Sequence, residues 1–132
     1  MKNYLIKSNE KISLAIIKLN LNNTKCLVVI DNKNKFFGTL TDGDLRKSFL
    51  LGTTINSPVS KVCQKNSHFL YEDEYSEKEI EKIFVEKDLN LIPILNTKKI
   101  VKLLKIRKPY SNKNLVKKNI MKFKKSILII MA

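Results

Sequence analysis

The stretch 38–44, Gly-Thr-Leu-Thr-Asp-Gly-Asp, combines residue types that could hold a phosphorylated ligand. It lies where a strand-like apolar pattern gives way to a helix-like pattern. A helix N-terminus favours an anion, because its free backbone N–H groups and its dipole act on the same charge. Thr41 could donate its hydroxyl to a phosphate oxygen, and Asp44 could accept from a pair of sugar hydroxyls. The spacing therefore predicts a phosphate site.

The same residues also allow a purely structural interpretation. Thr-x-x-Asp before an apolar run is the pattern of a capping box, in which Thr41 and Asp44 only close the helix. A capping box explains neither Gly38 nor Gly43. A strand glycine permits close approach by a ligand or another backbone, and a glycine within a helix costs about 1 kcal/mol relative to alanine. Both interpretations stay open, and the glycines favour the binding site.

The elements that would position this stretch follow from the apolar spacing. The run 26–30 is continuously apolar and bounded by polar residues, which is typical of a strand buried on both faces. The helix after the motif is predicted to stop at Gly52. The elements expected in the first half are a strand at 4–6, a helix at 12–19, strands at 26–30 and 36–40, and a helix at 42–51.

The same order repeats in the second half at an offset of 64 to 65 residues. The run 91–95 matches 26–30, and 100–101 matches 36–37. A possible strand at 69–71 and a helix at 76–87 come before them, and Ser76 and Glu79 are predicted to make a second capping box. Two units that are each too small for a core would bury their sheets together. Pro93 inside the strand predicts an edge position or a bulge.

The second copy lacks the motif. At an offset of 64, the glycine, the threonine and the second aspartate of the motif fall on Lys102, Lys105 and Lys108. No carboxylate remains there to receive sugar hydroxyls. The sequence therefore predicts one site per chain, in the first half, and a solvated basic face in the second, although the three lysines could still contact phosphates.

The pattern Gly-h-h-Thr-x-x-Asp after a strand–turn–strand resembles the nucleotide-binding motif of CBS (cystathionine β-synthase) domains. The longer run 38–47 resembles the subgroup found N-terminal to bacterial sugar-nucleotide pyrophosphorylases. The resemblance covers most of residues 1–105 and implies an α/β (α+β) fold, with two β-α-β-β-α repeats packed as a pseudo-two-fold pair. It implies repeat 1 at 1–55, repeat 2 at 56–109, and a linker with the first strand of a missing nucleotidyltransferase domain at 110–132.

The resemblance also implies a function, which is a regulatory module that senses an adenosine nucleotide (AMP, ADP or ATP) and is not itself an enzyme. Thr41 would contact phosphate, Asp44 the ribose, and Arg46 would add charge on the phosphate side. Mg²⁺ would be held only beside a bound phosphate. The nucleotide-binding residues implied are Gly38, Thr39, Thr41, Asp42, Asp44 and Arg46.

The resemblance further implies two partners, a second copy that associates through the helices and a catalytic domain fused in the parent protein. The final apolar run, 127–132, ends where a glycine-rich loop of such an enzyme would begin. The alternative is an ordinary terminal strand. The alternative function is a structural dimerisation module with an empty cleft.

The net charge of +14, from 26 basic and 12 acidic residues, invites a nucleic-acid interpretation. All basic residues except Arg46 and Arg107 are lysines, no aromatic residues interleave with them, and no DNA-reading motif occurs. Lysine together with abundant asparagine and isoleucine is typical of an AT-rich genome. A nucleic-acid-binding protein is therefore the weaker alternative, with the lysines serving mainly as a solvated surface.

Other functional classes have little support in the sequence. No apolar run approaches the roughly 20 residues of a membrane span, and the start lacks the features of a signal peptide, so a cytoplasmic protein is expected. Cys26 and Cys63 are too isolated for a disulfide framework or a metal site. His68, the single histidine, has no catalytic partner in the pattern and is predicted to be structural.

Overall fold

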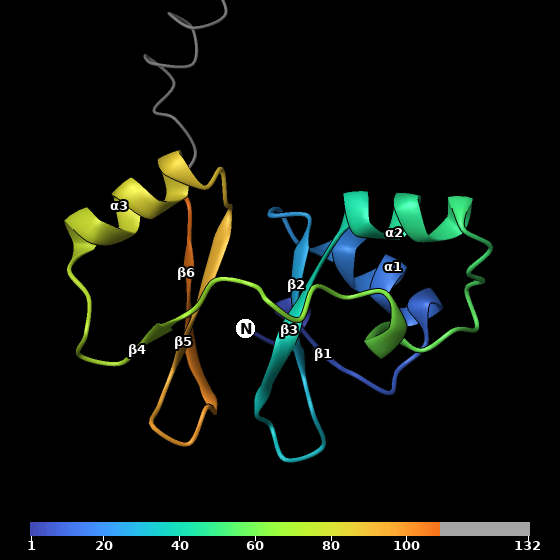
Figure 1. Cartoon of the computed structure of the whole chain (residues 1–132), viewed down its shortest axis with the longest axis horizontal. Helices are drawn as coiled ribbons and strands as arrows, with labels where there is room; N and C mark the ends of the chain where they lie inside the picture. The colour runs from blue at the N-terminus through green and yellow to red at the C-terminus, as the bar shows by residue number, and fades with distance from the viewer. Residues whose placement is uncertain (109–132) are drawn as a thin grey trace, which may run out of the picture.

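The computed structural model describes residues 1–108, and the predictions for 110–132 and for the chain beyond Pro109 lie outside this range. The helices and strands form two similar halves (Figure 1). The elements, in chain order, are the 3₁₀ helix η1 (Lys2–Tyr4), β1 (Leu5–Lys7), α1 (Ile12–Leu21), β2 (Cys26–Ile30), β3 (Phe36–Thr41), α2 (Asp42–Leu50), the 3₁₀ helix η2 (Val59–Lys61), β4 (Leu70–Tyr71), α3 (Glu77–Glu86), β5 (Leu91–Leu95) and β6 (Val101–Ile106).

Each half builds one three-stranded sheet, in the orders β1-β2-β3 and β4-β5-β6. The first two strands of each sheet are parallel and the last two are antiparallel. Cys26 pairs with Thr41 in the first sheet, and Leu91 pairs with Ile106 in the second, so both partners shift by 65 residues. The mixed α/β class and the internal repeat are confirmed, with strand–helix–strand–strand as the common unit.

The strand register corrects the alignment of the lost motif. Val29 pairs with Gly38 and Ile94 with Leu103, so the counterpart of Gly38 is Leu103 and not Lys102. By the same offset of 65, Thr41 corresponds to Ile106. The alignment at 64 was wrong by one residue, which in a strand turns each side chain to the opposite face. Within the described part of the second repeat the glycine and the hydroxyl are still missing.

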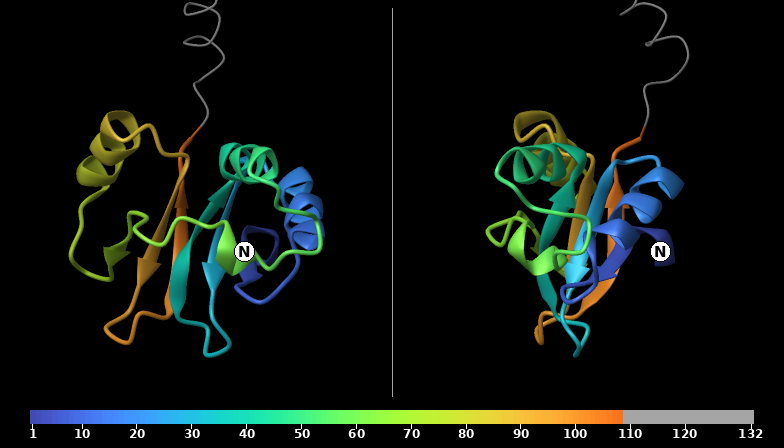
Figure 2. Two further views of the ribbon diagram at one scale, coloured as in Figure 1. Left: turned by 45° about the vertical axis from the view of Figure 1, so that its right-hand side comes forward. Right: turned by 90° about the vertical axis from the view of Figure 1, so that its right-hand side faces the viewer.

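The two sheets pack against each other, with the helices on their outer sides (Figure 2). The strand β2 contributes to two clusters, as its continuous apolar run predicts. Leu27 and Val29 pack with α1 in the core of the first repeat. Val28 and Ile30 pack with residues of the second sheet, including Leu91 and Leu95. Both faces of β2 are therefore buried, and the shared cluster joins the repeats.

Pro93 lies in β5, the middle strand of its sheet, so the predicted edge position was wrong for the sheet as a whole. The neighbouring strand β4 has only two residues, and they pair with Ile94 and Leu95. No residue of β4 pairs with Pro93. The N–H that proline lacks is therefore not needed for the hydrogen bonds between β4 and β5. The register also shifts between Ile94 and Leu95, so the predicted bulge lies one residue further on.

The turn between β2 and β3 depends on Asp31, whose Oδ1 accepts hydrogen bonds from the backbone N–H groups of Lys33 (2.8 Å) and Lys35 (2.9 Å). The bond from Lys35, followed by the bond from Lys33, lowers the pKa of Asp31 against the opposing effect of desolvation. In the second repeat Asn96 makes the same contacts, to Lys98 (2.9 Å) and Ile100 (3.0 Å), without a titrating group.

Replacing Asp31 with asparagine is expected to remove one acid-sensitive contribution to stability. A carboxyl group whose pKa is lower in the folded state stabilises the fold above its unfolded pKa of about 3.9 and loses that effect as the pH falls through the folded value. Urea unfolding at pH 7 and at about pH 3 should show a smaller loss of stability for the Asp31→Asn variant than for the unmodified protein. An equal loss would contradict this role of Asp31.

Candidate functional site

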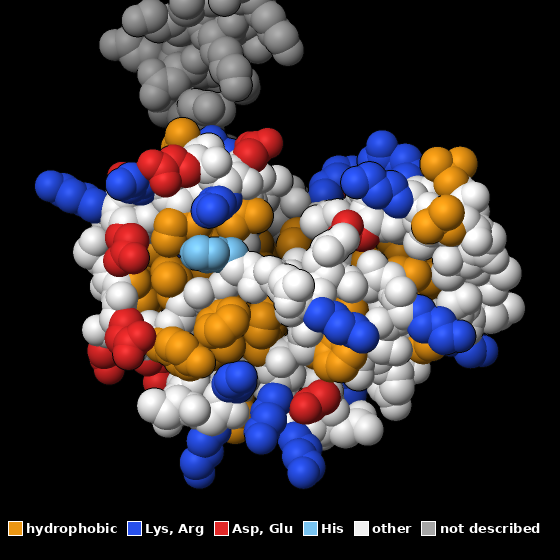
Figure 3. All heavy atoms as spheres, in the orientation of Figure 1, with side chains coloured by type: hydrophobic (Ala, Val, Ile, Leu, Met, Phe, Trp, Pro, Cys, Tyr) orange, Lys and Arg blue, Asp and Glu red, His pale blue; other side chains and the backbone are white. Residues whose placement is uncertain are grey.

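A cleft of about 780 Å³ opens between the two repeats. The first repeat contributes the N-terminus of α2 and the loop before β2, and the second contributes the loop between α3 and β5. A segment that joins the repeats, residues 64–68 and called the strap below, forms a further wall. Figure 3 shows the hollow between the two halves, with hydrophobic side chains inside it. Its size suits a small organic ligand.

Five of the six residues predicted for the site line this cleft, and Gly38 does not. The five are Thr39, Thr41, Asp42, Asp44 and Arg46. Gly38 is buried beneath the strap, where an added Cβ would collide with the carbonyl oxygen of Gln64 and lie 3.3 Å from Lys65 Cα. Gly38 thus permits the close approach of another backbone, which was one of its two predicted roles, and its placement in the ligand site is corrected.

The capping box of α2 is present. Thr41 Oγ1 accepts a hydrogen bond from Asp44 N (3.2 Å), and Asp44 Oδ2 accepts one from Thr41 N (3.0 Å). The structural interpretation of these two residues is therefore confirmed. Both side chains can still bind a ligand while they cap the helix, because the Thr41 hydroxyl keeps its own proton to donate and a carboxylate has about four acceptor positions.

Unlike Gly38, Gly43 has no neighbouring atom close enough to require a glycine. An added Cβ there would meet only Thr41 Oγ1, at an ordinary 3.7 Å. The residue nevertheless lies in the first turn of α2 and lines the cleft. Gly43 therefore leaves the backbone of the helix N-terminus uncovered on the side of the cleft, where an anion could reach the N–H of Gly43. The neighbouring N–H groups of Asp42 and Asp44 already donate to Lys25 O (3.4 Å) and Thr41 Oγ1 (3.2 Å).

The charges around the cleft are partly compensated. Lys25 Nζ lies 3.9 Å from Asp42 Oδ2, and Arg107 pairs with Asp88 at 3.3 Å. Arg46 and Lys87 also line the cleft, and the dipole of α2 adds positive potential at its N-terminus. Two of the three aspartates that line the cleft are thus paired with a basic side chain, and the rim can accept a negatively charged group.

The floor near β2 is uncharged. Burial, with a smaller contribution from the charge of Asp44, raises the pKa of the Cys26 thiol to about 12, so the side chain stays a neutral thiol at physiological pH. Leu89 and Leu91 line the same cleft from the second repeat. The cleft therefore combines an apolar floor with a polar rim, as small-molecule sites generally do.

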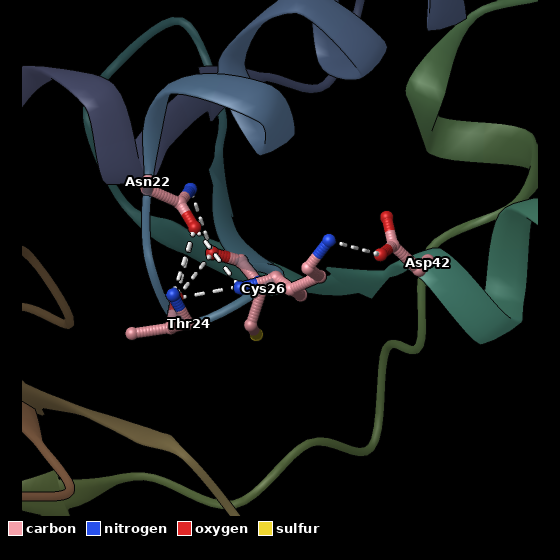
Figure 4. A network of polar contacts seen from close by, with 5 residues as sticks. Asn22, Thr24, Cys26 and Asp42 are labelled. Carbon is pink, nitrogen blue, oxygen red and sulfur yellow. Dashed lines mark hydrogen bonds and ion pairs between the residues drawn. The ribbon is translucent and has the colours of Figure 1, made fainter. Parts of the chain in front are cut away.

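The loop that leads into β2 is held by a buried amide. Asn22 Oδ1 accepts hydrogen bonds from Thr24 N (3.2 Å), Thr24 Oγ1 (3.1 Å) and Lys25 N (3.0 Å), and its Nδ2 donates to Cys26 O (3.3 Å). Figure 4 shows this network and, close to it, Asp42, whose carboxylate pairs with Lys25. The network fixes the three cleft residues Thr24, Lys25 and Cys26. The sequence indicated only the end of a helix here.

The strap is attached to β3 through its backbone and a serine. Gln64 N donates to Thr39 O (2.8 Å), and Thr39 N donates to Gln64 O (3.0 Å). Ser67 Oγ donates to Gln64 O (2.6 Å) and lies 2.6 Å from Thr39 Oγ1. These contacts hold Gln64, Asn66, Ser67 and His68 at the cleft. Sequence reasoning missed this wall because the strap has no periodic pattern.

His68 differs from its prediction. It is exposed and lines the cleft, so it is not a buried structural residue. The neighbouring Phe69 makes the structural contribution instead. Its ring centroid lies 5.4 Å from the ring centroids of Phe36 and Tyr71, in the cluster between the sheets. The strand-like pattern was correctly placed, and the histidine lies just before it.

Residues 1–108 contain neither a candidate membrane span nor a metal-binding cluster. None of their helices has the length and apolar content needed to cross a membrane. No group of three or more His, Cys, Asp or Glu side chains in this range is arranged to hold a metal ion.

No protein-family model matches the sequence, and no curated protein matches it either. Solved structures do resemble the fold. The CBS domains of a transcriptional regulator from Streptococcus pneumoniae match with a TM-score of 0.68 at 12% identity, over 80% of this chain and 85% of that chain.

Two further structures have matches of similar quality. One is a putative archaeal homologue of γ-AMPK from Methanocaldococcus jannaschii, with a TM-score of 0.66 at 23% identity over 77% of this chain and 42% of that one. The other is the cytosolic domain of the Mg²⁺ channel MgtE in complex with ATP, with a TM-score of 0.63 at 13% identity over 79% and 42%.

The likeness agrees with the geometry described above. Two strand–helix–strand–strand units repeat at a fixed offset, and their sheets share one buried cluster beside a common cleft. The described part of the chain therefore has the fold of CBS-domain proteins.

Proposed function

We propose that this chain is a regulatory module that binds an adenosine nucleotide in the cleft between its repeats. The observation that carries the proposal is the N-terminus of α2, where Gly43 leaves the backbone uncovered beside Thr41 and Asp44. The fold does not require a glycine there, whereas the absence of a side chain would let a bound phosphate come close to the helix backbone. The MgtE domain, whose structure contains ATP, supports an adenosine nucleotide among the possible ligands.

The cleft offers a partner for each part of such a ligand. The Thr41 hydroxyl and the backbone N–H of Gly43 at the N-terminus of α2 would receive a phosphate, and Asp44 would accept the ribose hydroxyls. Arg46 would add positive charge on the phosphate side. The apolar floor at Cys26 and Leu91 would face the base. Asp42 would help to hold Mg²⁺ only when a phosphate supplies further oxygen ligands.

Binding would regulate an attached domain by favouring one of its states. We propose a sugar-phosphate nucleotidyltransferase as that domain, on the resemblance of the run 38–47 alone, because the similar structures provide no link to such enzymes. In this proposal the chain itself would supply the binding module, and the attached domain would supply the catalysis. On the same reasoning the module would act in the cytoplasm, next to its fused domain.

Titration calorimetry with AMP, ADP and ATP, with the cytidine and guanosine nucleotides as comparison, tests the proposal. At least one adenosine nucleotide is expected to bind with one site per chain, because the second repeat lacks the glycine and the hydroxyl. The melting temperature should rise with the concentration of that nucleotide. Folded protein that gives neither heat nor a thermal shift with any of the nucleotides would refute nucleotide sensing.

The second candidate function, a structural dimerisation module, is favoured by one observation. The C-terminal end of α2 exposes apolar side chains, with Leu50 and Leu51 each 88% exposed. Exposed leucines in neighbouring positions suggest a covered surface in an assembly. Sedimentation with and without nucleotide separates the candidates, since a dimer that forms without ligand and shows no thermal shift would favour the structural module.

A further inference from the structure

The carboxylate of Asp44 is oriented by two donors of its own chain. Thr41 N donates to Oδ2 (3.0 Å), and Gln64 Nε2 donates to Oδ1 (3.2 Å). Each carboxylate oxygen can accept two hydrogen bonds, so each keeps one acceptor position. The two donors come from different elements, the helix cap and the strap, and together they fix the plane of the carboxylate.

Gln64 has a firmly placed backbone under an exposed side chain. Its N–H and C=O pair with Thr39, its C=O also accepts from Ser67 Oγ, and Gly38 allows this close approach. The side chain therefore starts from a fixed point at the mouth of the cleft. An amide held in this way can position a neighbouring group at a small cost in conformational freedom.

We infer that Gln64 is a positioning residue that makes the nucleotide site select ribose over 2′-deoxyribose. The inference rests on the proposed function, in which Asp44 receives the ribose hydroxyls. With its plane fixed, the carboxylate presents one free acceptor position on each oxygen, which matches the two neighbouring O–H donors of a ribose. A 2′-deoxyribose has one donor fewer and leaves one of these positions unpaired in the cleft, which lowers its affinity.

A competing arrangement makes the opposite prediction. If the Gln64 amide blocked Oδ1, a ligand would have to displace it, and removal of the amide would strengthen binding. The remaining acceptor position on each oxygen favours the positioning role, because the ribose can bind without breaking the bond between Gln64 and Asp44. The sign of the change in affinity therefore separates the two arrangements.

The test is calorimetry with two matched pairs of probes, ATP with 2′-deoxy-ATP and AMP with 2′-deoxy-AMP. The Gln64→Ala variant is expected to bind the ribonucleotide about two- to tenfold more weakly, which is the usual effect of one hydrogen bond. The deoxy probe should be nearly unaffected, so the preference for ribose falls by the same factor. The control Asn56→Ala, at an exposed residue outside the cleft, should keep the full preference.

A second variant, Gln64→Glu, keeps the length of the side chain and replaces the donor with a like charge, so it should lose at least as much ribose preference. Equal weakening of both probes, an unchanged preference, or tighter ATP binding would overturn the role of Gln64 and leave nucleotide binding standing. If the unmodified protein binds none of the four probes and does not bind ADP, the proposed function itself fails. A ribose preference in the unmodified protein that both variants lose supports the inference.

Discussion

Replacing Gly38 with alanine is expected to lower the free energy of unfolding by about 1–3 kcal/mol, the usual cost of forcing an extra group into a packed site. The added Cβ would collide with the Gln64 carbonyl oxygen and come within 3.0 Å of the Gln64 carbonyl carbon. Both are backbone atoms held by bonds to Thr39, so neither can move aside as a flexible side chain would. Urea unfolding followed by circular dichroism measures the loss.

The Gly43→Ala variant is the matched control, since it makes the same chemical change five residues further along the chain. Its added Cβ has room, and alanine is better than glycine within a helix by up to about 1 kcal/mol. The control should therefore be as stable as the unmodified protein or slightly more so. Similar stability of the two variants would mean that the strap does not press on β3 as described. A weaker affinity of Gly43→Ala for nucleotide would support the approach of a phosphate to α2.

Gly38 also shows what the sequence could and could not predict about the site. The residue type indicated a close approach, and the chain-local pattern located the strand and the helix on either side. The partner of that approach is Gln64, which is 26 residues away and lies in a segment without periodicity. Contacts of this kind depend on tertiary structure, so the strap and its cleft residues could not be derived from local spacing.

The internal repeat also shows which features the sequence could predict and which it could not. Apolar spacing predicted the strands and helices from β1 to β5 to within a few positions, but it missed the short helices η1 and η2 and marked only the start of β6. It left the offset uncertain between 64 and 65, because the apolar runs match almost equally well at either value. Strand pairing fixes the value at 65, since Ile30 pairs with Phe36 and Leu95 with Val101. Hydrogen-bond register is the information that a single sequence lacks.

The largest effect on ligand binding is expected from Asp44→Ala. A hydrogen bond to a charged group contributes about 1.5–3 kcal/mol, so loss of the ribose acceptor should weaken the affinity for an adenosine nucleotide at least about tenfold. The variant should also lose up to about 1 kcal/mol of stability, because Asp44 Oδ2 no longer accepts from Thr41 N in the capping box. Calorimetry gives the first effect and urea unfolding the second.

The second repeat provides a control for the structural part of this effect. Ser76 caps α3 by accepting a hydrogen bond from Glu79 N (3.2 Å), and neither residue lines the cleft. The Ser76→Ala variant should cost about 1 kcal/mol in stability and leave nucleotide affinity unchanged. If Ser76→Ala weakened binding as much as Asp44→Ala, the loss would reflect a less stable fold, and Asp44 would be only a helix cap. A loss confined to Asp44→Ala would separate its role in binding from its role in the cap, since both variants disturb a helix N-terminus and only one of them faces the cleft.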